Sequence, residues 1–337
     1  MSDELGVVVI GRNEGERLVR CLQSLSERAH RVVYVDSGSV DNSVASARRL
    51  GADTVELDTS RPFTAARGRN AGWRRLLQSA PDLEWVQFVD GDCEVRDGWL
   101  ETARDYLRAH DDVGIVCGRR RERYPEASPY NRLADLEWDT PIGEAEAAGG
   151  DAMVKADALR RTDGYRESMI AGEDPEFCLR VRQLGYRVMR LDVEMTWHDS
   201  DMMHLSQWWK RTSRAGHAYM EAAFLHGGND ERYRVRQAAS ILAWGAALPA
   251  AALLPVAPSG GTSTGLLGAY GVLWTRVYRN SRRRGMSTEH ARLYATATTV
   301  GKVAEAQGAL QYIANRIRGR GSELIEYKGA ESGSAED

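Results

Sequence analysis

The sequence lacks the patterns that mark several common classes of protein. Its four cysteines are scattered over 337 residues, with no C-x-x-C pair and no zinc-type spacing, so we expect reduced thiols. It contains neither G-x-x-x-x-G-K-[ST] nor G-x-G-x-x-G, the fingerprints of P-loop and dinucleotide-binding proteins. The net charge is only −3, so no excess of positive charge would attract nucleic acid, and we expect no nucleic-acid partner.

Targeting signals and repeats are also missing. The first residues carry two acids and no basic segment, and the apolar run that follows is short, so we expect no secretory signal. No segment of 20 to 50 residues recurs along the chain, which argues against a repeat protein. Residues 321–337 are rich in Gly, Ser and Glu, and we expect them to form a flexible tail.

The first hundred residues alternate between two periodicities. Short apolar runs at 6–10, 31–35, 52–57 and 85–89 are typical of buried strands. Between them, residues 18–25, 44–50 and 63–77 place apolar side chains at helical spacing. Strands that alternate with helices predict an α/β domain with a mixed, mainly parallel sheet and flanking helices. We place this domain at residues 1–205.

Three polar clusters directly follow strands in this pattern. In open α/β sheets, ligands bind outside the carboxyl ends of the strands. We therefore expect the clusters to lie along one edge of the sheet. They are Arg12-Asn13-Glu14, Asp36-Ser37-Gly38-Ser39 and Asp90-Gly91-Asp92.

The third cluster is a candidate metal site. Asp90 and Asp92 are separated by one glycine at a strand end, so their carboxylates can converge on a hard cation such as Mg²⁺ or Mn²⁺. Such a cation would neutralise a diphosphate leaving group. A solvated acidic turn is the alternative, because D-x-D is common in proteins.

Residues 206–320 differ in composition and predict a helical region. The segments 239–258 and 259–275 carry no charge, and arginines precede and follow them. This pattern predicts a C-terminal helical hairpin at about 239–275, either associated with a membrane with cytosolic flanks or buried in protein. Trp208 and Trp209 with Lys210 could form an interfacial helix. A further helix should begin after Ser287 as N-cap and continue to about Arg318.

The motifs of the first 200 residues, taken in order, resemble those of family 2 glycosyltransferases with the Rossmann-like GT-A fold. The family has a turn after its first strand, a D-[DS]-G-S-x-D segment, an R-N helix start, D-x-D, a GG loop, a G-E-D segment and a later histidine. This chain shows VVVIGRNE, VDSGSVDNS, ARGRNAGW, FVDGDCE, AAGGDAMV, AGEDPEFCLRVRQLGYR and WHDS.

The resemblance implies a donor site for a UDP- or GDP-linked sugar. Asp36 would contact the nucleobase, with Asn13 and Glu14 on the neighbouring turn. Arg12 stands where the family has an aromatic residue, and a guanidinium can also stack on a flat ring. The remaining implied donor-site residues are Arg69 and Asn70, beside the nucleotide, and Asp90. For Arg69 an exposed helix charge is the alternative.

The resemblance also implies catalytic and metal-binding residues. Asp174, with Glu173 beside it, would be the general base that deprotonates the acceptor. A helix N-cap is the alternative for Asp174, because Pro175 follows it. His198 would join Asp92 and Asp90 as a metal ligand or be structural. The acceptor-side loop comprises Gly149, Gly150 and Asp151, where Asp151 either binds sugar hydroxyls or shapes the turn.

The implied activity is metal-dependent, inverting transfer of a sugar to a hydroxyl, on a glycan or polyprenyl-linked acceptor at the cytoplasmic face of a membrane. Gln207 to Arg211 contain the residue types of the processive motif Q-x-x-R-W in the wrong order, so processive synthesis is not expected. A haloacid-type hydrolase is disfavoured because D-x-D follows the fourth strand, not the first. The serious alternative is a non-catalytic, membrane-tethered scaffold that binds nucleotide sugars or glycans.

Overall fold

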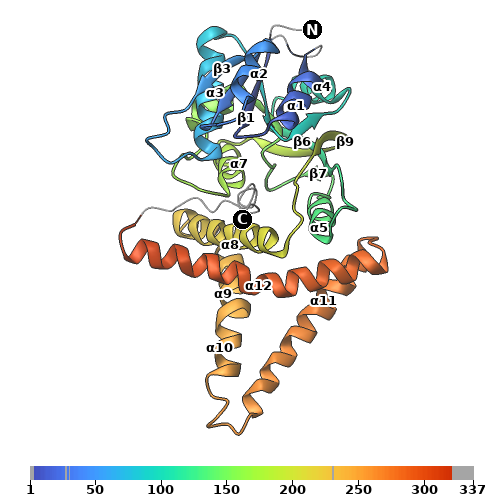
Figure 1. The fold of residues 1–337 in the computed structure, drawn as a ribbon, viewed down its shortest axis with the longest axis vertical. Coiled ribbons are helices and arrows are strands. Elements are labelled where there is room, and N and C mark those ends of the chain that lie inside the picture. The colour runs from blue at the N-terminus through green and yellow to red at the C-terminus, as the bar shows by residue number, and fades with distance from the viewer. Residues whose placement is uncertain (1–3, 27–28, 30, 230, 321–337) are drawn as a thin grey trace, which may run out of the picture. The chain divides into compact units, whose positions relative to one another are not determined.

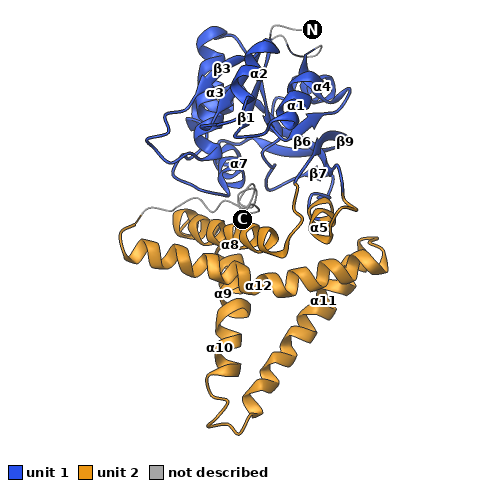
Figure 2. Cartoon of the chain, viewed as in Figure 1, with its two compact units in different colours: residues 1–124, 137–200 blue, residues 125–136, 201–337 orange. Residues whose placement is uncertain are grey.

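The protein consists of two compact units (Figure 2). The computed structural model describes residues 4–26, 29, 31–229 and 231–320. Within these residues, unit 1 contains 4–124 and 137–200, and unit 2 contains 125–136 and the residues from 201 onward. The segment 125–136, which the sequence analysis placed in the first domain, therefore clusters with the second unit. The tail expected at 321–337 lies outside the described residues.

Unit 1 is built on one mixed sheet with the strand order β3-β2-β1-β4-β8-β6-β9-β5, and β7 pairs with β9 (Figure 1). Strands β3, β2, β1 and β4 run parallel, β8 is antiparallel to both neighbours, and β6 and β9 are again parallel. The strands are β1 Leu5–Gly11, β2 Val32–Asp36, β3 Asp53–Glu56, β4 Trp85–Asp90, β5 Cys93–Val95, β6 Val113–Glu122, β7 Gly143–Glu144, β8 Ala152–Lys155 and β9 Arg187–His198.

Helices separate the first four of these strands, as the sequence predicted, and the α/β fold class is confirmed. Helix α1 shows why: its four buried residues recur every three or four positions, so one face packs on the sheet while the other meets water. The helices of unit 1 are α1 Glu16–Leu25, α2 Ser43–Arg49, α3 Ala65–Ser79, α4 Trp99–Ala109, α6 Ala156–Thr162 and α7 Glu173–Gln183.

Helix α3 lies unusually close to the centre of the sheet because glycines face it. A Cβ atom at Gly72 would lie 2.3 Å from Val8 Cγ1, and one at Gly68 would lie 3.2 Å from Ile10 Cγ2. Thr64 caps the helix by accepting a hydrogen bond from the Arg67 amide. Arg69 follows Gly68 on this helix, and the close packing buries its side chain.

Unit 2 is helical. Its helices are α5 Pro129–Glu137, α8 Leu205–His226, α9 Val235–Leu242, α10 Leu248–Leu253, α11 Ala269–Arg283 and α12 Thr288–Ile317. Helices α8 and α12 cross closely at glycines, because a Cβ atom at Gly216 would lie 1.9 Å from Glu305 O. The predicted N-cap is confirmed, since Ser287 Oγ accepts a hydrogen bond from the His290 amide.

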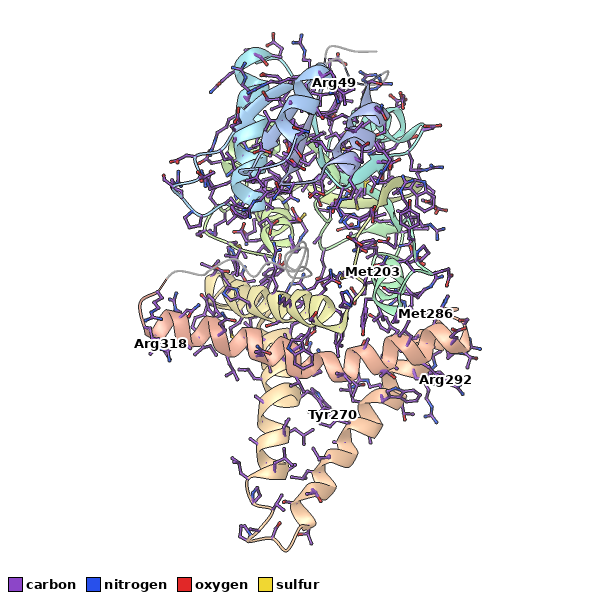
Figure 3. The ribbon with its side chains drawn as sticks, in the orientation of Figure 1. Arg49, Met203, Tyr270, Met286, Arg292 and Arg318 are labelled. Atoms are coloured by element: carbon purple, nitrogen blue, oxygen red, sulfur yellow. The ribbon has the colours of Figure 1, made fainter. Side chains whose placement is uncertain are left out.

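The uncharged segment forms the helical hairpin that the sequence predicted. One arm contains α9, a π-helical turn at Ala243–Ala247 and α10; the other contains a 3₁₀ turn at Thr262–Gly268 and α11 (Figure 1). Tyr270, labelled in Figure 3, joins the arms by donating a hydrogen bond to Trp244 O. None of the described helices combines the length and the apolar character that crossing a membrane requires.

Candidate active site

The three strand-end clusters lie at one edge of the sheet, as the sequence predicted. In the parallel register, Gly11 on β1 is opposite Asp36 on β2, and Ile10 is opposite Asp90 on β4. The Gly91 amide also donates a hydrogen bond of 2.8 Å to Ile10 O. The ends of β1, β2 and β4 therefore bring the clusters together.

Asp36 shapes the loop that follows β2. It is 2% exposed and accepts hydrogen bonds from the Tyr34 hydroxyl at 2.9 Å, from the Gly38 amide at 2.9 Å and from the Ser39 amide at 2.8 Å. Both carboxylate oxygens are thus engaged by the protein. Its contact with a nucleobase stays a prediction, and the geometry shows a carboxylate that fixes the conformation of the loop.

The turn after β1 is tied to this loop. Asn13 adopts a left-handed backbone conformation with φ of 55°. Its backbone N–H donates a hydrogen bond to Ser39 Oγ, and its side-chain Oδ1 accepts one from the backbone N–H of Val40. Glu14 forms an ion pair with Arg17 at 3.0 Å. The Arg12 guanidinium lies over the Phe63 ring, 4.4 Å from its centre, as in a cation–π contact. Asn13 therefore ties the turn after β1 to the Asp36 loop, and both belong to the predicted nucleobase subsite.

Arg69 is the junction of the site. Its guanidinium is 3% exposed and pairs with Asp90 Oδ1 at 2.9 Å, Glu173 Oε1 at 2.8 Å and Asp174 Oδ1 at 3.2 Å. The alternative of an exposed helix charge is therefore wrong. Because a buried guanidinium needs acidic partners, Arg69 holds the D-x-D strand end and the start of α7 together.

Asp174 is a buried acid in the first turn of α7. The helix begins at Glu173, after Gly172 with φ of 77°, so the alternative in which Asp174 is the N-cap is wrong. Burial is the main cause that raises the pKa of Asp174 to about 7, and the charges of Glu173 and Asp90 raise it further, against Arg69 and Arg120. A carboxylate with this pKa can take up a proton near neutral pH.

Asn70, the neighbour of Arg69, uses its whole amide on the protein. Its Nδ2 donates to Tyr165 O at 2.7 Å and to Glu167 Oε1 at 3.1 Å, and its Oδ1 accepts from the Tyr165 amide and from Trp73 Nε1. It therefore fastens the segment before α7 to α3. The contact with nucleotide that the resemblance implies stays a prediction.

The loop with two glycines packs on the D-x-D strand end. A Cβ atom at Gly150 would lie 2.3 Å from Arg69 Nη2, so only glycine fits there. Asp151 is fully buried, accepts hydrogen bonds from the Asp90 amide at 3.0 Å and from Thr196 Oγ1 at 2.7 Å, and pairs with Arg120 at 3.0 Å. Of its two possible roles, the structure supports the shaping of the turn.

A second group of side chains can hold a divalent cation. Asp92, Cys93 and His198 are buried, and their ligand atoms lie within 4.8 Å of one another; Asp92 Oδ2 is 3.4 Å from His198 Nε2. A carboxylate and an imidazole suit Mn²⁺. The thiol of Cys93 is a soft ligand that suits Mn²⁺ less well, and burial raises its pKa well above the ordinary value. Asp92 and His198 therefore fit the predicted metal site, whereas Asp90 pairs with Arg69.

The sequence did not reveal three other residues of this region: Arg120, Glu122 and Trp138. Arg120 lies between two acids: its Nη2 is 3.0 Å from Asp151 Oδ2 and 3.6 Å from Asp90 Oδ2. Trp138 packs on Arg120 and lies edge-on to the His198 ring at 4.7 Å. The run of arginines at 119–121 was a visible signal, but its register against β9 depends on three irregularities in the pairing of β6 with β9.

Known proteins resemble this chain in sequence. The family model described as glycosyl transferase family 2 matches residues 6–154. A pre-mycofactocin glycosyltransferase of Mycobacterium tuberculosis is 27% identical over 236 residues, which cover 66% of this chain and 48% of that protein. The succinoglycan biosynthesis protein ExoA of Rhizobium meliloti is 26% identical over 212 residues, 57% of this chain and 63% of that protein. The chain thus spans less than two thirds of either relative.

A solved structure is similar in fold. It is the mannosyltransferase PcManGT of Pyrobaculum calidifontis, in complex with GDP-Man and Mn²⁺. The alignment covers 93% of this chain and 88% of that one, with a TM-score of 0.65 and 21% sequence identity.

Proposed function

We propose that the chain transfers a sugar from a nucleotide diphosphate sugar to a hydroxyl group, because the model of glycosyl transferase family 2 matches residues 6–154. The donor would be a UDP- or GDP-linked sugar, bound with Mn²⁺ or Mg²⁺. The observation that carries the proposal is the Arg69 cluster, which joins the predicted donor-site acid Asp90 to the buried acid Asp174.

The residues of the sheet edge would divide the binding of the donor. The loops at Arg12-Asn13-Glu14 and at Asp36 lie where the nucleoside would bind, and the Arg12 guanidinium supplies a flat surface for a base. Asp92 and His198 would hold the cation. When bound, such a cation neutralises the charge that develops on the diphosphate leaving group.

Asp174 would supply the proton transfer. Its carboxylate takes the proton of the acceptor hydroxyl while the acceptor oxygen attacks the anomeric carbon from the face opposite the diphosphate. The bond between the anomeric carbon and the diphosphate oxygen breaks, so the configuration inverts. The raised pKa of Asp174 makes it a stronger base than an ordinary aspartate. Glu173 pairs with Arg69 at 2.8 Å, and in that position it tunes the charge around Asp174.

The acceptor would be a glycan or a polyprenyl-linked intermediate at the cytoplasmic face of a membrane. ExoA, whose name refers to succinoglycan biosynthesis, is a relative consistent with a glycan acceptor. The hairpin of unit 2 supports a membrane location, because it is uncharged over 239–275 and exposes Leu253, Leu254 and Val272. Arginines flank the uncharged stretch on both sides, as at a surface of anionic lipid.

Metal-dependent nucleotide binding tests the proposal against the non-catalytic scaffold. Isothermal titration of the full chain with UDP and with GDP, in Mn²⁺ or EDTA, should show affinity for at least one nucleotide that requires the metal. Asp92→Asn should abolish the effect of the metal, whereas Asp53→Asn, an exposed acid paired with Arg75, should not. A donor screen under the same conditions should then show turnover. Nucleotide binding without turnover of any donor would favour the scaffold, and no metal-dependent binding would contradict the donor site.

A further inference from the structure

Glu122 is a buried acid behind the candidate metal ligand His198. The two residues are partners in the parallel pairing of β6 with β9, and Cys93 on β5 is the partner of His198 on its other side. Glu122 is 1% exposed, and its Oε2 lies 3.7 Å from His198 Nδ1. The other ring nitrogen, Nε2, faces Asp92. The imidazole therefore lies between two carboxylates, one at each nitrogen.

The protein fixes the position of the Glu122 carboxylate. Its Oε1 accepts a hydrogen bond of 3.1 Å from the Tyr124 amide, and its Oε2 accepts from the amide and the hydroxyl of Ser200 at 3.1 and 2.5 Å. The Trp138 ring packs edge-on against the His198 ring, with 4.7 Å between the ring centres, and so limits rotation of the imidazole. The Glu122 carboxylate therefore faces Nδ1 at ion-pair range, at a distance longer than an ordinary hydrogen bond.

We infer that Glu122 is a positioning residue that holds His198 with its proton on Nδ1 and the free electron pair of Nε2 directed toward Asp92. This inference rests on the proposed function, in which Asp92 and His198 hold the cation. A ring nitrogen can bind a metal only when it carries no proton, and a carboxylate at the opposite nitrogen selects that tautomer. The interaction of the Glu122 carboxylate with Nδ1 also raises the electron density on Nε2, which strengthens the bond of Nε2 to a metal.

Replacement of Glu122 tests the inference through metal affinity. Glu122→Met removes the acceptor at similar size, and Glu122→Gln keeps an amide oxygen that can still accept from Nδ1. Loss of a partner behind a metal-binding histidine typically weakens metal affinity about 10- to 100-fold. We expect a loss in this range for Glu122→Met and a smaller one for Glu122→Gln, measured as Mn²⁺ affinity by electron paramagnetic resonance with UDP or GDP present.

The control is Glu194→Met, which removes an acid from the same pair of strands. Glu194 on β9 pairs with Arg121 on β6, and both side chains are partly exposed. The Mn²⁺ affinity of Glu194→Met should stay within about twofold of that of the unchanged protein. Equal Mn²⁺ affinity of Glu122→Met and the unchanged protein would overturn the inference. If the unchanged protein itself shows no metal-dependent nucleotide binding, the proposed function fails first, and the next measurement still decides the role of Glu122.

The tautomer of His198 can be read without metal or activity. Long-range ¹H–¹⁵N correlation spectra distinguish Nδ1–H from Nε2–H in a neutral histidine, and the spectrum of His198→Gln identifies the signal among the seven histidines. We expect the Nδ1–H form in Asp92→Leu, which removes the carboxylate at Nε2 and keeps Glu122 at Nδ1, and a shift toward Nε2–H in the double variant Asp92→Leu/Glu122→Met. An Nε2–H tautomer in Asp92→Leu would overturn the inference, even where the double variant fails to fold.

Discussion

The Arg69 guanidinium lies 3.2 Å from Asp174 Oδ1, and this buried ion pair links α3 to the start of α7. The same guanidinium contacts Asp90 at the end of β4. The acid proposed to deprotonate the acceptor and the acid of the predicted donor site thus share one cation. A change at either acid alters the electrostatic environment of the other, because few water molecules can screen charges in so buried a cluster.

The first prediction concerns the pH dependence of stability. The pKa of Asp174 is about 7 in the folded protein, above its ordinary value of 3.8. Between these values the folded state binds a proton that the unfolded chain has released, so the contribution of Asp174 to stability falls as pH rises through this window. Asp174→Asn stays neutral, and its Tm relative to that of the unchanged protein should therefore rise from pH 5 to pH 8. An equal difference at both pH values, in thermal unfolding followed by circular dichroism, would contradict the prediction.

The second prediction concerns Asn70. Asn70→Ala leaves the amide and carbonyl of Tyr165 and the Trp73 indole without their partner, and a buried polar group without a partner costs about 1–3 kcal/mol. We expect a loss of about 2–4 kcal/mol in the free energy of unfolding in urea. The control is Ser79→Ala, which removes one hydrogen bond at the end of the same helix and should cost about 1 kcal/mol or less. A loss for Asn70→Ala as small as that of the control would show that its hydrogen bonds are dispensable.

The third prediction concerns the hairpin of unit 2. The full chain should sediment with vesicles that contain phosphatidylglycerol and much less with pure phosphatidylcholine, because the flanking arginines attract anionic lipid. Leu254→Asp places a charge on a side chain that is 82% exposed and should weaken the binding severalfold. Val40→Asp, at an even more exposed apolar residue in unit 1, should leave it unchanged. Equal sedimentation of both variants would contradict a membrane role for the hairpin.

The sequence predicted the parallel half of the sheet and the edge that carries the site. Buried strands such as β1 are continuous apolar runs, and polar residues that follow them must lie at the carboxyl ends. The strand pattern therefore predicted the places of Asp36 and Asp90. The helical hairpin was equally visible, as a long stretch without charge.

The remainder depended on contacts between distant segments. Glu122 faces His198 because irregularities in β6 shift its register against β9, and no local pattern encodes that shift. The sequence likewise could not show that Asn70 spends its hydrogen bonds on Tyr165 and Glu167, or that 125–136 clusters with unit 2. Side-chain partners more than 70 residues apart are set by packing, which motif spacing does not describe.

The most direct test of the account compares donor binding with turnover in Asp174→Asn, using the nucleotide sugar that the donor screen identifies. Loss of a general base typically slows a reaction about 10²- to 10⁴-fold. We expect a fall in turnover of this size, with Mn²⁺-dependent affinity for the donor within about threefold of that of the unchanged protein. Loss of donor affinity in proportion to turnover, or turnover that persists, would contradict the assignment of Asp174 as the base.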